Sequence, residues 1–445
     1  MKRPIAFLAL LGLLATLHVS SASAAALSSQ EMNELEATYN RLTSEFYKKV
    51  EPQSVFQGVH TQLVAFLQKN GVSAPRVPAP RATEDAERNL KELDHELASV
   101  VTTYGTKFGS RALTYEAISG LLHSVNDKYT VFLSPKEYAA LNAGLDGQSF
   151  SGVGISIGVD EATKVLRVNQ VIPGTPADKA GVLADDIITE IDGKPTKGLS
   201  TDQDSSLLRG KRGSIVRITV ERNGQTLPEP IAITRDLIKS PTVFARLLPN
   251  DIGYAQLTVF GQNTSDELSA ALQRLQAQGA KAFVLDLRDN GGGYLQSAVD
   301  VSSKFVSDGP IVSVESRSSN ITTFDAEPGA IPSRPLAVLV NKYTASASEI
   351  TASAIQDSGV GTLFGTKTYG KGVVQTIFPL PDGSAIKITT ARYLTPRNRD
   401  INLIGVQPDV VLEQSKGARL GDLKTDSQLQ AAVAFLEQKL TAQAQ

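Results

Sequence analysis

The sequence predicts a multidomain α+β protein with a helical N-terminal region, a small β-rich domain and an α/β core that ends in a helix. Three observations predict this order: helical periodicity before residue 148, short strands with glycine turns from about 148 to 238, and alternating strands and helices beyond 239. The length of 445 residues also favours two or three domains over one. The predicted segments are a signal peptide (1–24), the helical region (25–147), the β-rich domain (148–238) and the core (239–445).

The first 24 residues have the pattern of a secretory signal. Lys2 and Arg3 precede an apolar stretch from Ile5 to Val19, and Ala22-Ser23-Ala24 supplies the small residues of a cleavage site. This order predicts export to a bacterial-type periplasm, with an uncleaved single-pass anchor as the alternative. The chain has no cysteine, so it is stabilised without disulfides.

The N-terminal region shows helical spacing of apolar residues. One seam follows intervals of three and four residues, which predicts either a helix packed on its neighbours or a dimerisation helix; its members are Met32, Leu35, Tyr39, Leu42 and Phe46. Proline-rich residues 74–80 predict an extended connector. Further helices are predicted after Thr83 and from Leu113 to Leu122.

The remaining elements follow from two periodicities. Val216, Ile218 and Val220 alternate with polar residues, which predicts a half-buried strand, and Asn223-Gly224 predicts a hairpin turn after it. In the core, apolar runs predict strands and 3.6-residue patterns predict helices. The strands are expected at 252–257, 282–287 and 336–340, and the helices at 265–278, 349–356 and 426–441.

Composition excludes several classes of function. Without cysteine there is no thiol catalysis and no thiolate–zinc site. His60, His95 and His123, the histidines beyond the signal, all lie in the helical region, so a Ser-His-Asp triad in the core is disfavoured. A net charge of −2 with interspersed signs provides no electrostatic footprint for nucleic acid.

Two stretches match known motifs, but the residues around them argue against the function of each motif. Residues 154–158 match G-x-S-x-G, but they lie in a β-run rather than at a strand-to-helix turn, so Ser156 is expected to be a strand residue. Residues 365–371 match G-x-x-x-x-G-K. A phosphate loop would continue with Ser or Thr into a helix, whereas Gly372 and a strand-forming run follow here. No nucleotide is expected.

Ser346 and Lys371 are the remaining pair with catalytic chemistry. Ser346 and Glu349 fit a helix capping box, S-x-x-E, which is the structural interpretation of this serine. A serine at a helix N-terminus also lies among free N–H groups that would stabilise an oxyanion. With no histidine available, Lys371 is the candidate base, provided that burial brings its pKa towards 7–8. Gln375, four residues on, is placed to hold the amine.

These segments resemble the carboxyl-terminal processing peptidases, also called tail-specific proteases. The resemblance rests on NKYTASASEITASAIQD (341–357), GTKTYGKGVVQ (365–375), LDLRDNGGG (285–293) and GVQPDVVL (405–412), and it covers about 113–436. It implies a helical region, then a PDZ domain, then a Ser-Lys peptidase core of the ββα-repeat type. It also implies cleavage of proteins near their C-terminus without metal or cofactor.

The resemblance carries the family's site onto individual residues. It implies Ser346 as nucleophile, Lys371 as general base and Gln375 as its support. The implied oxyanion donors are the backbone N–H groups of Ala347 and Gly292. Many relatives have proline at the position of Gly291, so this glycine loop is expected to be freer.

In the PDZ domain, the loop Ser151–Ile155 is expected to bind the C-terminal carboxylate of a substrate, whose tail then adds as a β-strand. Its binding residues are Gly152, Val153, Gly154 and Ile155. The alternative is a groove that stays empty or only gates the core. Expected partners are proteins with accessible C-termini, a periplasmic adaptor and a second copy bound through the N-terminal helices. Two other interpretations stay open: an adaptor-dependent latent peptidase, and a PDZ binding module with an inert core.

Overall fold

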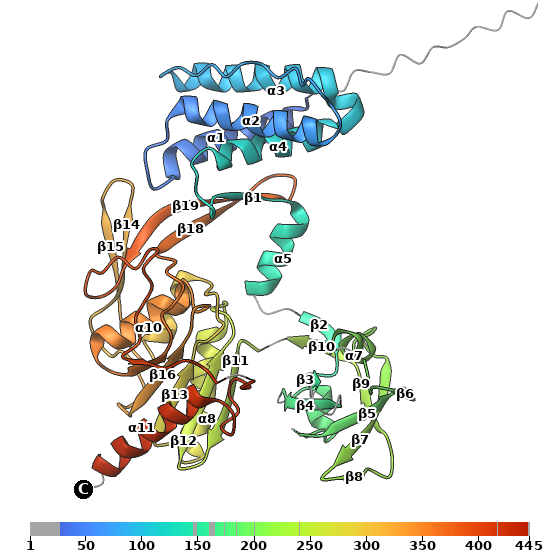
Figure 1. The fold of residues 1–445 in the computed structure, drawn as a ribbon, viewed down its shortest axis with the longest axis vertical. Helices are drawn as coiled ribbons and strands as arrows, with labels where there is room; N and C mark the ends of the chain where they lie inside the picture. Colours follow the sequence, from blue (N-terminus) through green and yellow to red (C-terminus); the bar gives the residue numbers. More distant parts are fainter. Residues whose placement is uncertain are drawn as a thin grey trace, which may run out of the picture. The chain divides into compact units, whose positions relative to one another are not determined.

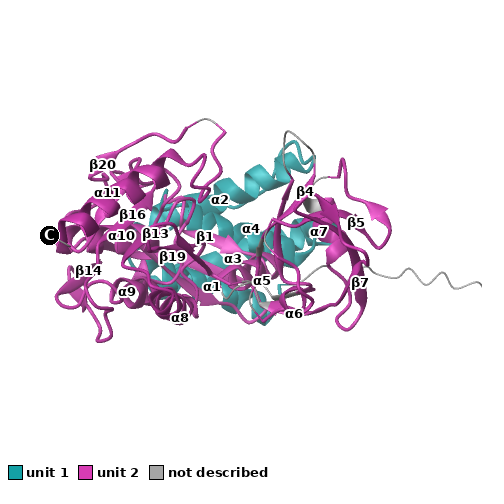
Figure 2. Cartoon of the chain, turned by 90° about the horizontal axis from the view of Figure 1, so that it is seen from below, with its two compact units in different colours: residues 1–43, 50–126 teal, residues 44–49, 127–445 magenta. Residues whose placement is uncertain are grey.

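The structure is a computed structural model, shown coloured along the sequence in Figure 1. It describes residues 27–145, 149–159, 165–172, 174–183, 185–199, 201–239, 241–415 and 417–443. The predicted signal peptide lies outside the described residues. The chain divides into two compact units, residues 1–43 with 50–126, and residues 44–49 with 127–445 (Figure 2). Within the described residues, no helix is both long and apolar enough to cross a bilayer.

Helices make up the described part of the first unit, and the predictions after Thr83 and from Leu113 are confirmed. The helices are α1 (Ser29–Glu45), α2 (Pro52–Lys69), α3 (Ala86–Phe108) and α4 (Ser110–His123). Helices α2 and α4 approach closely where two glycines meet: a Cβ on Gly58 would lie 2.4 Å from the carbonyl oxygen of Gly120. Helix α2 was not predicted, although Val55, Val59, Leu63 and Leu67 recur every four residues on its buried face.

The apolar seam of α1 is buried in the single chain. Leu35, Tyr39 and Leu42 are at most 2% exposed. Buried Asn89 on α3 donates a hydrogen bond to the Tyr39 hydroxyl at 3.0 Å, which ties the seam to its own unit. An oligomer formed through these helices would therefore have to use their other faces.

The β-rich domain is built on a seven-stranded antiparallel sheet. The strands are β3 (Ile155–Val159), β4 (Leu166–Val171), β5 (Ile187–Ile191), β6 (Lys194–Pro195), β7 (Ile215–Arg222), β8 (Gln225–Thr226) and β9 (Ile231–Thr234). Strand β7 alternates as predicted, with Val216, Ile218 and Val220 buried. The short helices α6 (Pro176–Lys179) and α7 (Thr201–Leu208) and the ribbon of β2 (Ser149–Gly152) and β10 (Asp236–Lys239) complete the domain.

The core is a six-stranded sheet between two helical layers. Its order is β11 (Val243–Leu248), β12 (Ile252–Leu257), β13 (Ala282–Asp286), β16 (Leu336–Val340), β17 (Thr362–Gly365) and β20 (Val410–Val411), parallel from β12 onwards. Alternate residues of each strand face opposite layers. One face packs on α8 (Thr264–Ala277), α9 (Leu295–Ser302) and α10 (Ala347–Ser358), and the other on α11 (Ser427–Gln443).

A second, five-stranded antiparallel sheet carries the predicted lysine bend. Its strands are β1 (Val131–Leu133), β14 (Pro310–Ser316), β15 (Ile321–Asp325), β18 (Val373–Pro379) and β19 (Ala385–Leu394), and α5 (Pro135–Leu145) follows β1. The bend at Lys371 leads directly into β18, which pairs with the long strand β19. Lys371 therefore leads into the five-stranded sheet, while Ser346 follows a strand of the six-stranded core sheet.

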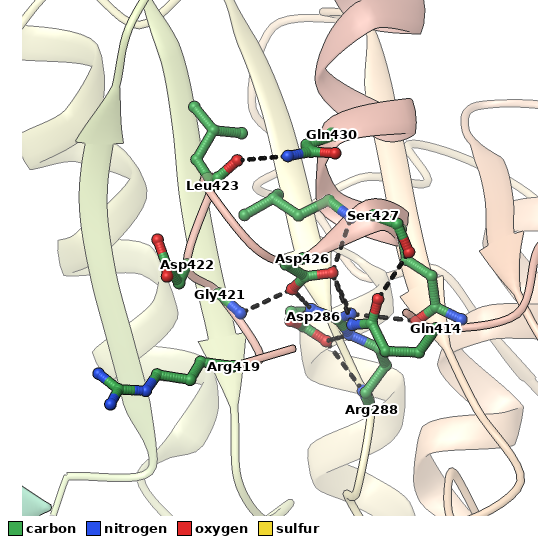
Figure 3. Close-up of polar contacts among 12 residues, drawn as sticks. Asp286, Arg288, Gln414, Arg419, Gly421, Asp422, Leu423, Asp426, Ser427 and Gln430 are labelled. Carbon is green, nitrogen blue, oxygen red and sulfur yellow. Dashed lines mark hydrogen bonds and ion pairs between the residues drawn. The ribbon is translucent and has the colours of Figure 1, made fainter. Parts of the chain in front are cut away.

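A fully buried ion network joins the end of β13 to the C-terminal helix (Figure 3). The Arg288 guanidinium donates to Asp286 at 2.6 and 2.9 Å and to Asp426 at 2.6 and 2.9 Å. Asp426 also caps α11 by accepting the N–H of Leu429 at 3.0 Å. Burial alone would raise the pKa of Asp426, but hydrogen bonding and the charge of Arg288 hold it below its usual value. Helix α11 is thereby locked to the segment that leads into the glycine loop.

We expect Arg288→Met to lower the free energy of unfolding by about 3–5 kcal/mol, because it leaves two carboxylates buried without their partner. Arg392→Met is the matched control, since Arg392 pairs with Glu315 and Asp400 but its side chain is 43% exposed. Its loss should stay within about 1 kcal/mol. Urea unfolding followed by circular dichroism measures the unfolding free energy of both variants. Equal losses would contradict the stabilising role given to the buried Arg288 network.

Candidate active site

Ser346 occupies a strained turn between a strand and a helix. Strand β16 ends at Val340, and α10 begins at Ala347. Ser346 has φ 58° and ψ −120°, which non-glycine residues rarely adopt. A strained strand-to-helix turn of this kind is how a nucleophile elbow exposes its serine. Ser156, in the matching sequence pattern, lies within β3 as predicted.

One buried carboxylate connects Ser346 to Lys371. Glu349 Oε2 accepts the backbone N–H groups of Ser346 at 2.9 Å and of Lys371 at 2.8 Å. Its Oε1 accepts the N–H of Gly370 at 2.7 Å and the hydroxyl of Thr368. Glu349 therefore does more than cap helix α10, which is the role that the sequence pattern indicates. Its carboxylate also binds the backbone of the lysine bend, so the serine turn and the lysine bend are held by one side chain.

The bend around Lys371 requires its two glycines. Gly370 has φ 85°, and a Cβ there would lie 2.9 Å from the backbone nitrogen of Gly405. A Cβ on Gly372 would lie 2.6 Å from the backbone nitrogen of Asn402. The turn that follows Ile401 supports the bend, since Leu403 donates its N–H to the carbonyl of Gly370 at 2.8 Å.

The surroundings of Lys371 favour its neutral form. Burial lowers the pKa of the ammonium most, and the positive charge of Lys387 lowers it further. Glu349 and Asp127 act in the opposite direction, and the resulting pKa is about 8. The Lys371 Nζ lies 5.0 Å from the ring centre of Tyr129. The expectation that burial brings this lysine towards neutrality therefore agrees with its surroundings.

Ser346 and Lys371 line one cavity of about 370 Å³. Apolar side chains form most of its wall, with Leu141, Val259 and Leu295 among them. The remaining polar lining comes mainly from Gln375, Lys387 and the glycine run 291–293. Among the described residues, no cluster of His, Asp or Glu is arranged to hold a metal ion.

Gly292 lies against the serine turn. It has φ 101°, and a Cβ there would come within 2.8 Å of the Ser346 Cβ and 2.9 Å of the Ala347 nitrogen. The structure thus brings together the two residues predicted to be oxyanion donors. The Ala347 N–H, the first of α10, has no partner within the helix. The Gly292 N–H, in contrast, donates to Asn290 Oδ1 at 2.9 Å.

Comparison with known proteins shows the family of the chain. Residues 251–412 match the peptidase family S41 and residues 167–222 match a PDZ domain. The carboxyl-terminal-processing protease of Picosynechococcus sp. is 38% identical over 333 residues, which cover 74% of this chain and 80% of the relative. The carboxy-terminal processing protease CtpA of Bacillus subtilis is 33% identical over 347 residues, 78% of this chain and 74% of the relative.

This chain belongs to the carboxyl-terminal processing protease family. It is a serine-type peptidase with a PDZ domain and an S41 peptidase core, as the sequence predicts. Among solved structures, a photosystem II D1 C-terminal processing protease matches with a TM-score of 0.49 and 31% identity, over 92% of this chain and 98% of that one.

Gln375 lines the cavity of this peptidase but makes its own contacts. Its side-chain amide donates to the carbonyl of Val373 at 3.3 Å and to Thr389 Oγ1 at 3.5 Å. These bonds anchor Gln375 on the β18–β19 ladder. Support of the Lys371 amine by Gln375 stays a prediction.

Two residues of the site escaped the sequence analysis. The buried Tyr393 hydroxyl donates to the Lys371 carbonyl and lies 3.2 Å from the Ser346 carbonyl oxygen. Buried Asn290 holds the glycine loop by donating to Leu257 O at 2.8 Å, while its own carbonyl accepts from Ser348 Oγ at 3.0 Å. Tyr393 lies in a strand of mixed polarity that offered no signal, whereas Asn290 stands next to a glycine run that did.

The PDZ domain has a groove at the predicted loop. Gly152, Val153, Gly154 and Ile155 line a cavity of about 70 Å³ together with Ile157 of β3 and Ser205, Leu208 and Arg209 at helix α7. Gly154 has φ 88°, and a Cβ there would collide with Thr175 at 2.3 Å. Strand β3 pairs with β4 and lies at the edge of its sheet. A strand edge beside a helix suits β-strand addition by a peptide.

We expect Glu349→Gln to lower both stability and the reactivity of Ser346 towards a fluorophosphonate probe. The amide places an NH2 group against backbone N–H donors, which should cost about 1–3 kcal/mol of unfolding free energy. Glu267→Gln is the control: Glu267 accepts the N–H groups of Thr242 and Val243 at 2.6 and 3.2 Å and does not line the cavity. It should lose stability without losing probe reactivity. Equal loss of reactivity in both variants would argue against a specific role of Glu349 in positioning Ser346 and Lys371.

Proposed function

We propose that this peptidase cleaves proteins near their C-terminus with Ser346 as nucleophile and Lys371 as general base. The observation that carries the proposal is the shared carboxylate of Glu349, which binds the backbone N–H groups of both residues beside one cavity. A lysine with a pKa of about 8 is partly neutral near pH 7, so it can accept a proton.

The proposed reaction is acyl transfer. Neutral Lys371 Nζ takes the proton of Ser346 Oγ, and the oxygen attacks the carbonyl carbon of the scissile peptide bond. The N–H groups of Ala347 and Gly292 stabilise the negative oxygen of the tetrahedral intermediate. The lysine ammonium then returns its proton to the leaving amine. Water hydrolyses the acyl-enzyme with Lys371 again as base, and Gln375 supports the amine.

The PDZ groove is the proposed binding site for the substrate's C-terminus. The backbone of Gly152 to Ile155 would receive the terminal carboxylate, and the tail would pair with β3. We place the PDZ domain at 148–238 and the peptidase core at 239–445. The proposed location is the periplasm, reached through the signal peptide 1–24. A periplasmic adaptor or a second copy would bind the helical region 25–147.

The latent form that requires an adaptor has one observation in its favour. The Gly292 N–H is engaged by Asn290 Oδ1, so this oxyanion donor has to exchange its acceptor before it can serve the reaction. An adaptor or substrate that moves the glycine loop would make that exchange possible. Cleavage that appears only after periplasmic extract is added would support this form.

The deciding experiment compares wild type with Ser346→Ala and Lys371→Ala on an unfolded protein that has a free apolar C-terminus. We expect each variant to lose at least about 1,000-fold in rate, because nucleophile and base act as a unit. Intact mass spectrometry reads the products. The same substrate with an amidated C-terminus should be cleaved more slowly if the PDZ groove binds the carboxylate. Undiminished cleavage by Ser346→Ala would show that Ser346 is not the nucleophile.

The pH dependence tests the base separately. Only neutral Lys371 accepts a proton, so kcat/KM should rise tenfold per pH unit below about 8 and level off above it. At pH 7 about a tenth of the molecules would then be active. Initial rates between pH 6 and 10 measure the profile, with circular dichroism confirming that the fold persists. A profile that is flat between pH 6 and 8 would contradict a lysine base with this pKa.

A further inference from the structure

A second lysine in the catalytic cavity has no role in the proposed reaction. Lys387 lies in the middle of β19, opposite Ile377 of β18 and Val131 of β1. It lines the same cavity as Ser346 and Lys371. Ile377 and Val131 offer its amine no hydrogen-bond acceptor in their side chains.

The Lys387 ammonium has no partner among the described residues. Within that part of the chain its Nζ forms no hydrogen bond and no ion pair. Asp127 is the carboxylate whose charge it senses, and that group is already occupied. Asp127 accepts the Thr130 hydroxyl at 2.7 Å, the Thr389 hydroxyl and the Tyr129 N–H at 3.3 Å.

An unpaired ammonium in such a place is costly for the fold. Burial lowers the pKa of Lys387, while the charge of Asp127 raises it. An apolar side chain would fit the neighbours on β1 and β18 at no such cost. A ligand that brings a negative charge would gain from the same environment, since charge-assisted hydrogen bonds are strongest where water is excluded.

We infer that Lys387 forms a carboxylate-binding subsite within the catalytic cavity, which selects substrates with an anionic group close to the scissile bond. The inference rests on the proposed function, because it assigns a preference to that same site. The anion is either an acidic side chain of the substrate or the C-terminal carboxylate of a short tail.

Lys387 and Lys371 lie near one another in this cavity. Both side chains line it, and the charge of Lys387 is second only to burial among the causes that lower the pKa of Lys371. The anionic group is therefore expected close to the scissile bond, and a set of peptides determines its position.

The test measures binding and cleavage of a set of peptides. Each peptide carries Glu or Gln at one of the five positions on either side of the scissile bond, and its C-terminus is amidated. Fluorescence anisotropy measures their binding to the Ser346→Ala variant, which does not consume them. Cleavage by the chain with Ser346 intact gives kcat/KM for the same set.

We expect Glu to be preferred over Gln by about tenfold or more at one position, mainly through KM. Lys387→Met should abolish that preference, and Lys387→Arg should retain it. Lys342→Met is the matched control, because Lys342 packs on the Tyr343 ring and does not line the cavity. A second arm compares free and amidated C-termini in the Gln peptides. A preference for the free terminus that disappears in Lys387→Met would assign the carboxylate to the tail.

Loss of the charge of Lys387 also removes a repulsion that lowers the pKa of Lys371. That effect shifts the pH profile of Glu and Gln peptides alike, so it leaves their ratio unchanged. The inference is wrong if no position prefers Glu and no free terminus is preferred, or if the preference survives Lys387→Met. Binding to Ser346→Ala decides this even without turnover. Absence of Ser346-dependent cleavage would instead count against the proposed function.

Discussion

The carboxylate of Glu349 is the interaction on which the geometry of the site depends. Ser346 belongs to a helix that follows the six-stranded sheet, and Lys371 belongs to a bend that enters the five-stranded sheet. The two sheets contribute to one buried apolar cluster, which includes Tyr393 of β19 and Ile350 of α10. Four hydrogen bonds to one buried carboxylate, two of them from the Ser346 and Lys371 backbones, add a direct polar link between the serine turn and the lysine bend. The Tyr393 hydroxyl adds a second link between the same two backbones.

The glycine loop lies between a buried ion network and the serine turn. Arg288 joins the strand before the loop to the cap of the C-terminal helix, and both groups are fully buried. The glycine run that follows Asn290 is held by the Asn290 amide, which accepts from Gly292 and donates to Leu257, and by the Phe260 N–H, which donates to the Gly292 carbonyl at 2.9 Å. The Gly292 N–H can serve a substrate only by exchanging its bond to Asn290 for one to the substrate.

Lys371 and Lys387 line one largely apolar cavity, and this shared environment lowers the pKa of both. Each ammonium loses hydration, and Lys387 also repels the charge on Lys371. Asp127 opposes the effect but its oxygens are taken by hydroxyl and N–H donors, so it forms no close ion pair with either lysine in the described part of the chain. A Lys371 amine that is partly neutral and a Lys387 ammonium that lacks a partner are thus two results of one electrostatic arrangement.

The sequence by itself determined the order of the three regions and most core strands and helices, and it singled out Ser346 and Lys371 as the candidate pair. Periodicity, glycine spacing and the absence of cysteine are local properties, and they do not depend on how the chain closes. The second role of Glu349 and the placement of Tyr393, Asn290 and Lys387 were decided by the tertiary structure. Each of those roles is a contact between segments that are distant in sequence or on different strands. A capping glutamate, a strand tyrosine and a strand lysine look ordinary until folding brings their partners next to them.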